Sequence, residues 1–356
     1  MTLLGRLSSI GLSPTCCKWF ASYLTNRIQQ VKTDNILSEP LAITKGVPQG
    51  SILGPILFSI YINDVAKAAG SSRIHLYADD TILYASGPSL CSAASTLQDS
   101  LTSIEHSFHN LHLRLNSKKT KCILFNRKNN TSSPPKIVCA DNSELEFVKS
   151  YKYLRLWLDS SLSFSTHINN IQIKVKARLA FLFRNKASFT RSAKLTLVKM
   201  TILPIVDYGD TIYKMASKTA LHKMDVLHHS AIRFATNAPF NTHHCELFKL
   251  VDWPSLQTRR LRHWLQFIYK ALLGKTPYYL SSLLHVSRST YRTRSSELIK
   301  LINPLTRTTF GRNSFHFAAA FDWNKIQDTL KLTAFISQSA FKQKLGYVLV
   351  DPTCSC

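Results

Sequence analysis

Long apolar runs, secretion signals and acidic residues are all scarce in this chain of 356 residues. No stretch reaches the roughly 18 apolar residues of a membrane-spanning helix, and the longest candidate, ILGPILFSIYI at 52–62, is short and contains Pro55. The N-terminal MTLLGRLSSIGL lacks the basic segment and uninterrupted apolar stretch of a signal peptide. We therefore expect an intracellular protein of the nucleus or cytoplasm, neither secreted nor membrane-bound.

The cysteines form no recognisable framework, because none of the eight belongs to a CxxC pair. Without a secretion signal, we expect free thiols in a reducing compartment. His243, His244 and Cys245 carry zinc-binding atoms, but adjacent residues make poor tetrahedral ligand sets, so the sequence does not favour a zinc site there. The cysteines are Cys16, Cys17, Cys91, Cys122, Cys139, Cys245, Cys354 and Cys356.

The deficit of acidic residues leaves a net charge of +25, with a sequence pI near 9.9. Hydrophobic residues make up 45% and charged residues 18%, a globular rather than a disordered composition. Residues 1–100 hold 7 Lys and Arg against 6 Asp and Glu, whereas the remainder holds 38 against 14. The basic surplus therefore lies downstream, where it indicates either a polyanionic partner or a solvated lysine-rich surface.

A pair of adjacent carboxylates interrupts the apolar segment HLYADDTILYA at 75–85. Strand-forming residues flank Asp79 and Asp80, which predicts two short strands joined by a tight turn. Asp is common in turns, but a turn explains one Asp better than two, because neighbouring like charges repel. A divalent cation at the carboxylates would relieve that repulsion.

Periodicity and turn signals predict a mixture of helices and short strands. Ser13-Pro14 predicts an N-cap and first turn for a helix to about Leu24, followed by a hairpin from Gln29 to Ile43. The loop KGVPQGS then precedes a helix that ends before Gly70. An amphipathic helix is expected at about 90–114, with extended runs at 121–126, 136–139, 144–148 and 152–158, and helices dominate after His167.

These segments in this order closely resemble the reverse transcriptases of non-LTR (LINE-type) retrotransposons. The resemblance rests on GVPQGSILGPILFSIYINDV and LYADDTILYA, and it extends through NLHLRLNSKKTKCILF, YKYLRLWLDSSLSF and LPIVDYG. It covers most of residues 1–210, and SFHFAAAFDWNKIQDTL also resembles the end of such reading frames.

The resemblance implies an α+β fold: a partial right-hand polymerase palm, an antiparallel sheet with helices, at 1–158. A helical thumb at 159–235 and a basic helical C-terminal region at 236–356 are expected to follow. The implied function is RNA-directed DNA polymerase, with an RNA template, a DNA primer and deoxynucleoside triphosphates as partners. The implied cofactor is Mg²⁺, or Mn²⁺ in its place, because nucleotidyl transfer uses two metal ions.

The resemblance also assigns expected roles to particular residues. Asp79 matches the direct metal ligand and Asp80 the supporting carboxylate of the catalytic pair, and Lys119 matches a lysine beside the leaving pyrophosphate. The expected substrate-binding residues are Gly46, Pro48, Gln49, Gly50, Ser51 and Tyr77. The expected primer-grip residues are Tyr151, Tyr153 and Trp157, in a hairpin where this chain has Arg155 in place of the usual Gly. The expected nucleic-acid-binding residues are Lys174, Lys176, Arg178, Arg259, Arg260 and Arg262.

In the family, the fingers and the palm strand with the first catalytic aspartate precede LLGRLSSIGL, near the start of this chain. We therefore expect the C-terminal part of a polymerase that is inactive by itself. Two other classes stay open: a non-catalytic nucleic-acid-binding remnant of a transposable element, and an unrelated hydrolase such as an aspartic protease. The protease would need Gly after Asp-Asp-Thr, where this chain has Ile82.

Overall fold

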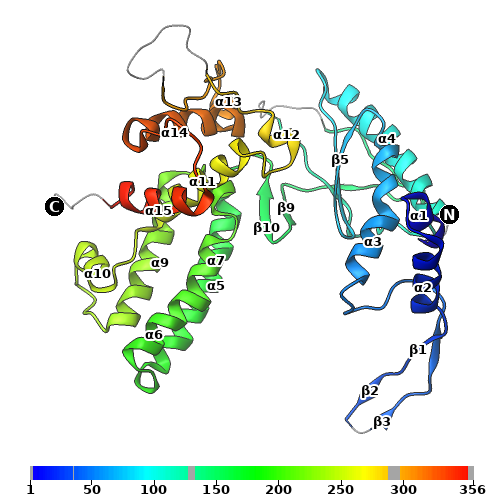
Figure 1. The fold of residues 1–356 in the computed structure, drawn as a ribbon, viewed down its shortest axis with the longest axis horizontal. Coiled ribbons are helices and arrows are strands. Elements are labelled where there is room, and N and C mark those ends of the chain that lie inside the picture. The colour runs from blue at the N-terminus through cyan, green and yellow to red at the C-terminus, as the bar shows by residue number, and fades with distance from the viewer. Residues whose placement is uncertain (1–2, 35, 127–132, 288–296, 352–356) are drawn as a thin grey trace. The chain divides into compact units, whose positions relative to one another are not determined.

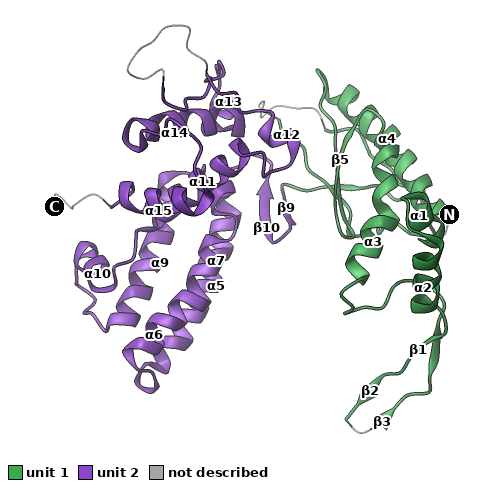
Figure 2. Cartoon of the chain, viewed as in Figure 1, with its two compact units in different colours: residues 1–149 green, residues 150–356 purple. Residues whose placement is uncertain are grey.

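The computed structural model describes residues 3–34, 36–126, 133–287 and 297–351. It divides into two compact units, residues 1–149 and 150–356, which are described separately (Figure 2). Figure 1 labels the elements along the chain. Across the described segments, no helix is both long enough and apolar enough to cross a membrane. The six cysteines in these segments are free thiols, as the sequence predicts.

Helices of unit 1 begin where the sequence places capping residues. The Ser13 hydroxyl accepts a hydrogen bond from the Cys16 amide, and Pro14 opens the helix, as predicted. A reciprocal capping box between Ser89 and Ser92 starts the long amphipathic helix. The helices are α1 (Leu3–Ser9), α2 (Pro14–Leu24), α3 (Gly54–Ile62), the 3-10 helix η1 (Asn63–Ala69) and α4 (Leu90–Asn110).

The described strands of unit 1 pair two by two and form no continuous sheet. Pairs β1–β4, β2–β3 and β5–β6 are antiparallel hairpins, whereas β7–β8 is parallel. The strands are β1 (Arg27–Gln29), β2 (Lys32–Thr33), β3 (Ile36–Leu37), β4 (Leu41–Ile43), β5 (Arg73–Tyr77), β6 (Asp80–Tyr84), β7 (Lys121–Cys122) and β8 (Glu146–Phe147). These described strands therefore do not join into the antiparallel sheet that the resemblance implies, because each strand pairs with one neighbour only.

The extended run at 136–139, which follows α4 in the chain, is held by a side chain and not by a neighbouring strand. The Gln98 amide donates to the Val138 carbonyl and accepts from the Val138 amide, both at 2.8 Å, as a neighbouring strand would. Ile137 and Cys139 are buried beside Leu145 in a small core. Packing and one side chain thus hold the extended run at 136–139, which makes only an isolated bridge, Val138 to Glu144. A second small core lies between η1 and α4 around Val65, Ile104 and Phe108.

Unit 2 opens with the hairpin β9–β10 and continues as helices. Its first core lies where α5 packs against α9, with Val175, Met224 and Ile232 fully enclosed. The first elements are β9 (Ser150–Tyr153), β10 (Leu156–Asp159), α5 (Ser165–Arg184), η2 (Lys186–Ser188), α6 (Arg191–Leu197), the π-helical η3 (Val198–Ile202), α7 (Leu203–Asp207), α8 (Asp210–Tyr213), α9 (Lys218–Thr236) and α10 (His244–Val251). The later helices are α11 (Leu256–Leu272), α12 (Tyr278–Ser281), α13 (Thr309–Asn313), α14 (Phe315–Leu330) and α15 (Gln338–Val348).

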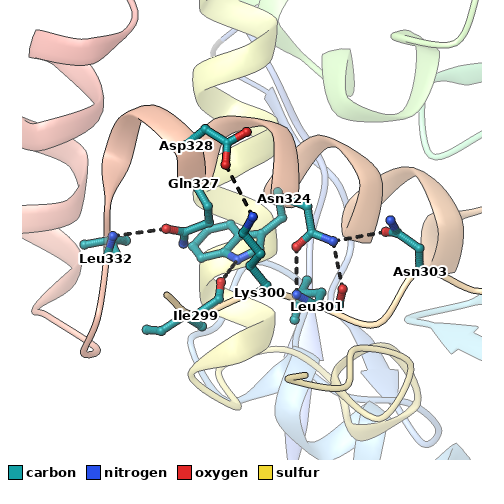
Figure 3. A network of polar contacts seen from close by, with 9 residues as sticks. Ile299, Lys300, Leu301, Asn303, Asn324, Gln327, Asp328 and Leu332 are labelled. Atoms are coloured by element: carbon teal, nitrogen blue, oxygen red, sulfur yellow. Dashed lines mark hydrogen bonds and ion pairs between the residues drawn. The ribbon is translucent and has the colours of Figure 1, made fainter. Parts of the chain in front are cut away.

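A second core of unit 2 gathers α11, α14 and α15 around Trp323, Tyr269 and Phe341. Side chains of α14 hold the extended segment 299–303 against this core (Figure 3). Asn324 accepts from the Leu301 amide and donates to the Leu301 carbonyl, each at 2.7 Å. Trp323 Nε1 donates to the Ile299 carbonyl at 2.7 Å. The motif DWNKIQD near the C-terminus therefore serves the fold.

Candidate active site and nucleic-acid interface

The carboxylate pair lies at the tip of the β5–β6 hairpin, as predicted. Tyr77 pairs with Asp80 in the ladder, so Ala78 and Asp79 form a two-residue turn. Ala78 has φ of +51°, in the left-handed region that hairpin turns require but that a side chain disfavours. This strained backbone fixes the direction in which the two carboxylates leave the hairpin.

The hairpin has a packed face and an open face. Ile74 and Leu83, a cross-strand pair, pack on the core between η1 and α4. Tyr77 and Asp80 form the pair on the opposite face, where both are exposed, and Asp79 is exposed at the turn. The apolar residues around the carboxylates thus anchor the hairpin, and the acids remain accessible to a cation.

The donor set suits a hard divalent ion. Mg²⁺ takes oxygen ligands and is usually held by one or two carboxylates together with substrate phosphates. Asp79 and Asp80 supply such oxygens from adjacent residues. Within the described segments no group of three or more His, Cys, Asp or Glu ligands includes either residue. Two protein carboxylates with open coordination positions therefore fit Mg²⁺ or Mn²⁺ bound jointly with a phosphate ligand.

The loop 44–53 before α3 is shaped by two glycines and one serine. Gly46 and Gly50 have φ of +88° and +79°, where a side chain would be strained, and open space surrounds both. The Ser51 hydroxyl donates to the Pro48 carbonyl at 2.7 Å and accepts from the Gly54 amide at 3.0 Å. Ser51 and Pro48 therefore fold the loop, while Gln49 is exposed on it.

Lys119 lies in a turn between α4 and β7, within unit 1. The Asn116 side chain and carbonyl both accept from the Lys119 amide at 3.1 Å, which closes this turn. The Lys119 side chain is exposed. This exposed position is compatible with the expected role, which stays a prediction.

The β9–β10 hairpin has a turn whose backbone would suit glycine at position 155. Tyr153 pairs with Leu156, so Leu154 and Arg155 form a two-residue turn with φ of +43° and +67°. Both values are positive, the condition that favours Gly at the second turn position. Arg155 keeps the hairpin in its tight form and bears the left-handed strain that a glycine would avoid.

The expected primer-grip residues do not share one face of that hairpin. Tyr151 pairs with Leu158, which packs on the helical core, and Tyr153 pairs with Leu156, which is buried on the same side of the hairpin. Trp157 pairs with Lys152 on the opposite side. The hairpin therefore presents Trp157 and the two tyrosines in different directions, and a common grip stays a prediction.

The basic residues expected to contact nucleic acid fall into two groups. Lys174 and Lys176 flank the buried Val175 on α5 and are exposed. Arg178 is also exposed, although it donates to the Thr201 carbonyl at 2.9 Å. The arginines of α11, by contrast, are engaged in the fold. Arg259 pairs with Asp207, Arg260 is 7% exposed, and Arg262 donates to the Gly346 and Leu349 carbonyls at the end of α15.

The motif LPIVDYG has structural contacts that sequence reasoning did not identify. Tyr208 donates through its hydroxyl to the Leu154 carbonyl at 2.7 Å, and a Cβ on Gly209 would lie 2.7 Å from Leu156. Asp210, just after the motif, is buried and contacts His263 at 2.6 Å, so its carboxylate raises the pKa of that imidazole. The motif thus joins β9–β10 and α11 around α7 and α8. Asp207 and Asp210 are visible in the sequence, but their partners Arg259 and His263 lie about 50 residues downstream, so the sequence does not show these pairs.

Comparison with known proteins identifies the family that the chain resembles. Residues 3–158 match the family described as reverse transcriptase (RNA-dependent DNA polymerase). Over 229 residues, 62% of this chain, it is 31% identical to the RNA-directed DNA polymerase from mobile element jockey of Drosophila melanogaster, covering 25% of that protein. Over 295 residues, 80% of the chain, it is 26% identical to the probable RNA-directed DNA polymerase from transposon X-element of the same species, covering 32% of it.

A third relative belongs to a different element. The chain is 26% identical to the retrovirus-related Pol polyprotein from type-1 retrotransposable element R1 of Nasonia vitripennis. The 197 aligned residues cover 52% of this chain and 58% of that protein. The chain spans about a quarter to a third of the jockey and X-element relatives. The chain therefore carries a reverse transcriptase domain, at residues 3–158, and belongs with the reverse transcriptases of non-LTR retrotransposons.

Proposed function

We propose that this chain contributes the catalytic carboxylates Asp79 and Asp80 to an RNA-directed DNA polymerase, which copies an RNA template by extending a DNA primer. The observation that carries the proposal is the exposure of both acids at the tip of a hairpin whose other face is packed. Bound together with the triphosphate, Mg²⁺ supplies charge neutralisation at the reacting phosphate and activation of the primer hydroxyl. Asp79, at the turn, is the direct ligand, and Asp80 supports it.

In this proposal the neighbouring residues hold the substrates. Gly46 and Gly50 lack side chains where the loop backbone comes close to the nucleotide, and Gln49 both donates and accepts hydrogen bonds there. Tyr77, on the same face as Asp80, limits the space beside the carboxylates. Lys119 carries the positive charge that stabilises the departing pyrophosphate. Unit 1 then corresponds to part of a palm.

The helices of unit 2 are proposed to bind the template–primer duplex by its backbone. Lys174 and Lys176 are exposed on α5, and Lys and Arg exceed Asp and Glu by 38 to 14 beyond residue 100. Charges of this kind bind phosphates with little sequence preference and in a salt-dependent way. The arginines of α11 are left out of this surface because Arg259 and Arg262 have partners within the fold and Arg260 is buried. Helices α5 to α9 then correspond to a thumb.

We expect the 356 residues alone to extend no primer. Two-metal transfer needs carboxylates on both sides of the ion pair. In the described segments, Asp79 and Asp80 have no third acid close enough to complete a three-ligand group. The family match leaves the hydrolase class without support, whereas nucleic-acid binding without catalysis remains the alternative.

Metal binding at the hairpin tests the proposal in the chain as it stands. Mn²⁺ is added to isotope-labelled protein, and paramagnetic broadening of backbone NMR signals is mapped along the sequence. Broadening centred on Asp79 and Asp80, lost in the double variant Asp79→Asn/Asp80→Asn and kept in Asp99→Asn, is the expected result. Asp99 is a matched control because it is an exposed acid on α4. Duplex binding with no broadening at the hairpin would favour the non-catalytic alternative.

A further inference from the structure

Three metal-ligating side chains meet at the start of α10, and a fourth lies beside them on α9. His243 is the N-cap of α10, and His244 and Cys245 are its first two residues. One ligand atom from each of these three lies within 4.8 Å of the others. From the neighbouring helix α9, the ring of His229 lies 5.7 Å from the ring of His244, centre to centre. The cluster therefore draws on two helices.

The chain brings these residues together by a fixed turn. Helix α9 ends at Thr236 and is capped by Asn237, which has a left-handed φ of +58°, and α10 packs back against α9. Figure 1 shows the two helices side by side. The Arg233 guanidinium donates to the Thr242 carbonyl at 3.0 Å and so secures the connecting loop. Phe248 of α10 contacts the His229 ring, which holds that imidazole against the start of α10.

The geometry overcomes the objection that adjacent residues ligate one ion poorly. His243 has an extended backbone, with φ of −63° and ψ of 147°, so its side chain does not follow the helical spacing of His244 and Cys245. The ring centres of His243 and His244 lie only 4.1 Å apart. With Zn–N bonds of about 2.0–2.1 Å, two imidazoles on one tetrahedral ion have ring centres about 5 Å apart. The observed separations of 4.1 and 5.7 Å bracket that value.

The chemistry of the four groups selects the ion. Three imidazoles and one thiol suit Zn²⁺, whereas Mg²⁺ and Ca²⁺ need carboxylate oxygens. Glu246, the nearest acid in sequence, is paired with Lys249 at 2.8 Å. His243 Nδ1 accepts only a long hydrogen bond of 3.4 Å from the Cys245 amide. A metal ion bound at Nδ1 would therefore replace only this weak hydrogen bond.

We propose that His229, His243, His244 and Cys245 form a Zn²⁺ site that fastens α10 to α9. The other cluster of this kind in the described segments, Asp207, Asp210 and His263, is already neutralised by Arg259 and by its own histidine. The zinc site is independent of the carboxylates of unit 1, because all four ligands belong to unit 2.

The test uses the full chain, purified without a polyhistidine tag and freed of metal by chelation. Co²⁺ is titrated as a spectroscopic probe, because tetrahedral cobalt absorbs strongly in the visible region and a cobalt–thiolate bond adds a near-ultraviolet band. Zn²⁺ affinity is then measured by displacement of Co²⁺. The site variants are Cys245→Ser and His229→Asn. The matched controls are Cys91→Ser and His106→Asn, both exposed on α4.

The expected result is one Co²⁺ per chain with a tetrahedral spectrum and a thiolate band. Cys245→Ser abolishes the thiolate band, His229→Asn weakens Zn²⁺ binding on the order of tenfold or more, and both controls bind as the wild type does. A thiolate band that survives in Cys245→Ser overturns the proposal, as does octahedral or absent Co²⁺ binding. Cys245 is partly exposed at the helix surface, so its serine variant keeps the test decisive even if His229→Asn fails to fold.

Discussion

Removing the Asn324 side chain should destabilise unit 2 strongly although it lies far in sequence from every residue proposed to act in catalysis. In Asn324→Ala, the Leu301 amide and carbonyl lose their 2.7 Å partners on α14. Two such hydrogen bonds are worth about 1–3 kcal/mol net, and leaving the Leu301 N–H unpaired adds desolvation of about 1–3 kcal/mol. Because Asn324 is only half-buried, water replaces part of the loss. We expect the free energy of unfolding to fall by about 2–4 kcal/mol.

The assay is thermal unfolding followed by circular dichroism, where a loss of this size in a unit of residues 150–356 lowers Tm by roughly 4–16 °C. The matched control is Asn303→Ala, which removes the other partner of Asn324, an exposed contact of 3.2 Å, and should change Tm little. If Asn324→Ala unfolds at the temperature of Asn303→Ala, Asn324 does not hold segment 299–303 as described.

Three further predictions concern the β9–β10 turn, the pair of His263 with Asp210, and the lysines of α5. Arg155→Gly should raise the free energy of unfolding by up to about 1 kcal/mol, since it removes left-handed strain, whereas Arg155→Ala should bring no such gain. If urea titrations give the two variants the same free energy of unfolding, the strain at Arg155 is refuted. His263 has a raised pKa, so the stability that its pairing with Asp210 confers is fully present below pH 6.5 and lost as pH rises through the folded pKa. The gap in urea midpoint between wild type and His263→Gln should therefore close from pH 6 to pH 9; a gap that widens contradicts it. Replacing Lys174 and Lys176 with Gln should reduce the salt dependence of duplex binding by about one in log–log slope per lysine, and an unchanged slope would remove α5 from the interface.

Local signals in the sequence predicted the helices well. Ser13 and Pro14 mark the start of α2, and the apolar spacing of Leu101, Ile104 and Phe108 matches the buried side of α4. These elements depend on residues within one or two turns of each other, so the sequence shows them directly. The hairpin at 75–85 was equally predictable, because strand formers flank a two-residue turn.

Pairing over longer distances was not predictable. The run at 121–126 forms a strand only at Lys121–Cys122, and residues 136–139 are held by Gln98, 40 positions earlier. The composition shows a surplus of lysine and arginine but not which acids these residues pair with, so the sequence could not show that Asp207 pairs with Arg259. The adjacency of His243 to Cys245 was visible, whereas the approach of His229 depends on how α9 and α10 pack.

Asp79 and Asp80 are proposed to be the metal-binding carboxylates of an RNA-directed DNA polymerase. The most direct measurement is primer extension on an RNA template with Mg²⁺, by a chimera in which residues 3–158 of this chain replace the matching segment of the jockey polymerase. We expect this chimera to extend the primer. Asp79→Asn should abolish the extension, Asp80→Asn should reduce it and Asp99→Asn should leave it intact. Extension by the Asp79→Asn chimera at the unsubstituted rate would show that Asp79 is not the metal ligand.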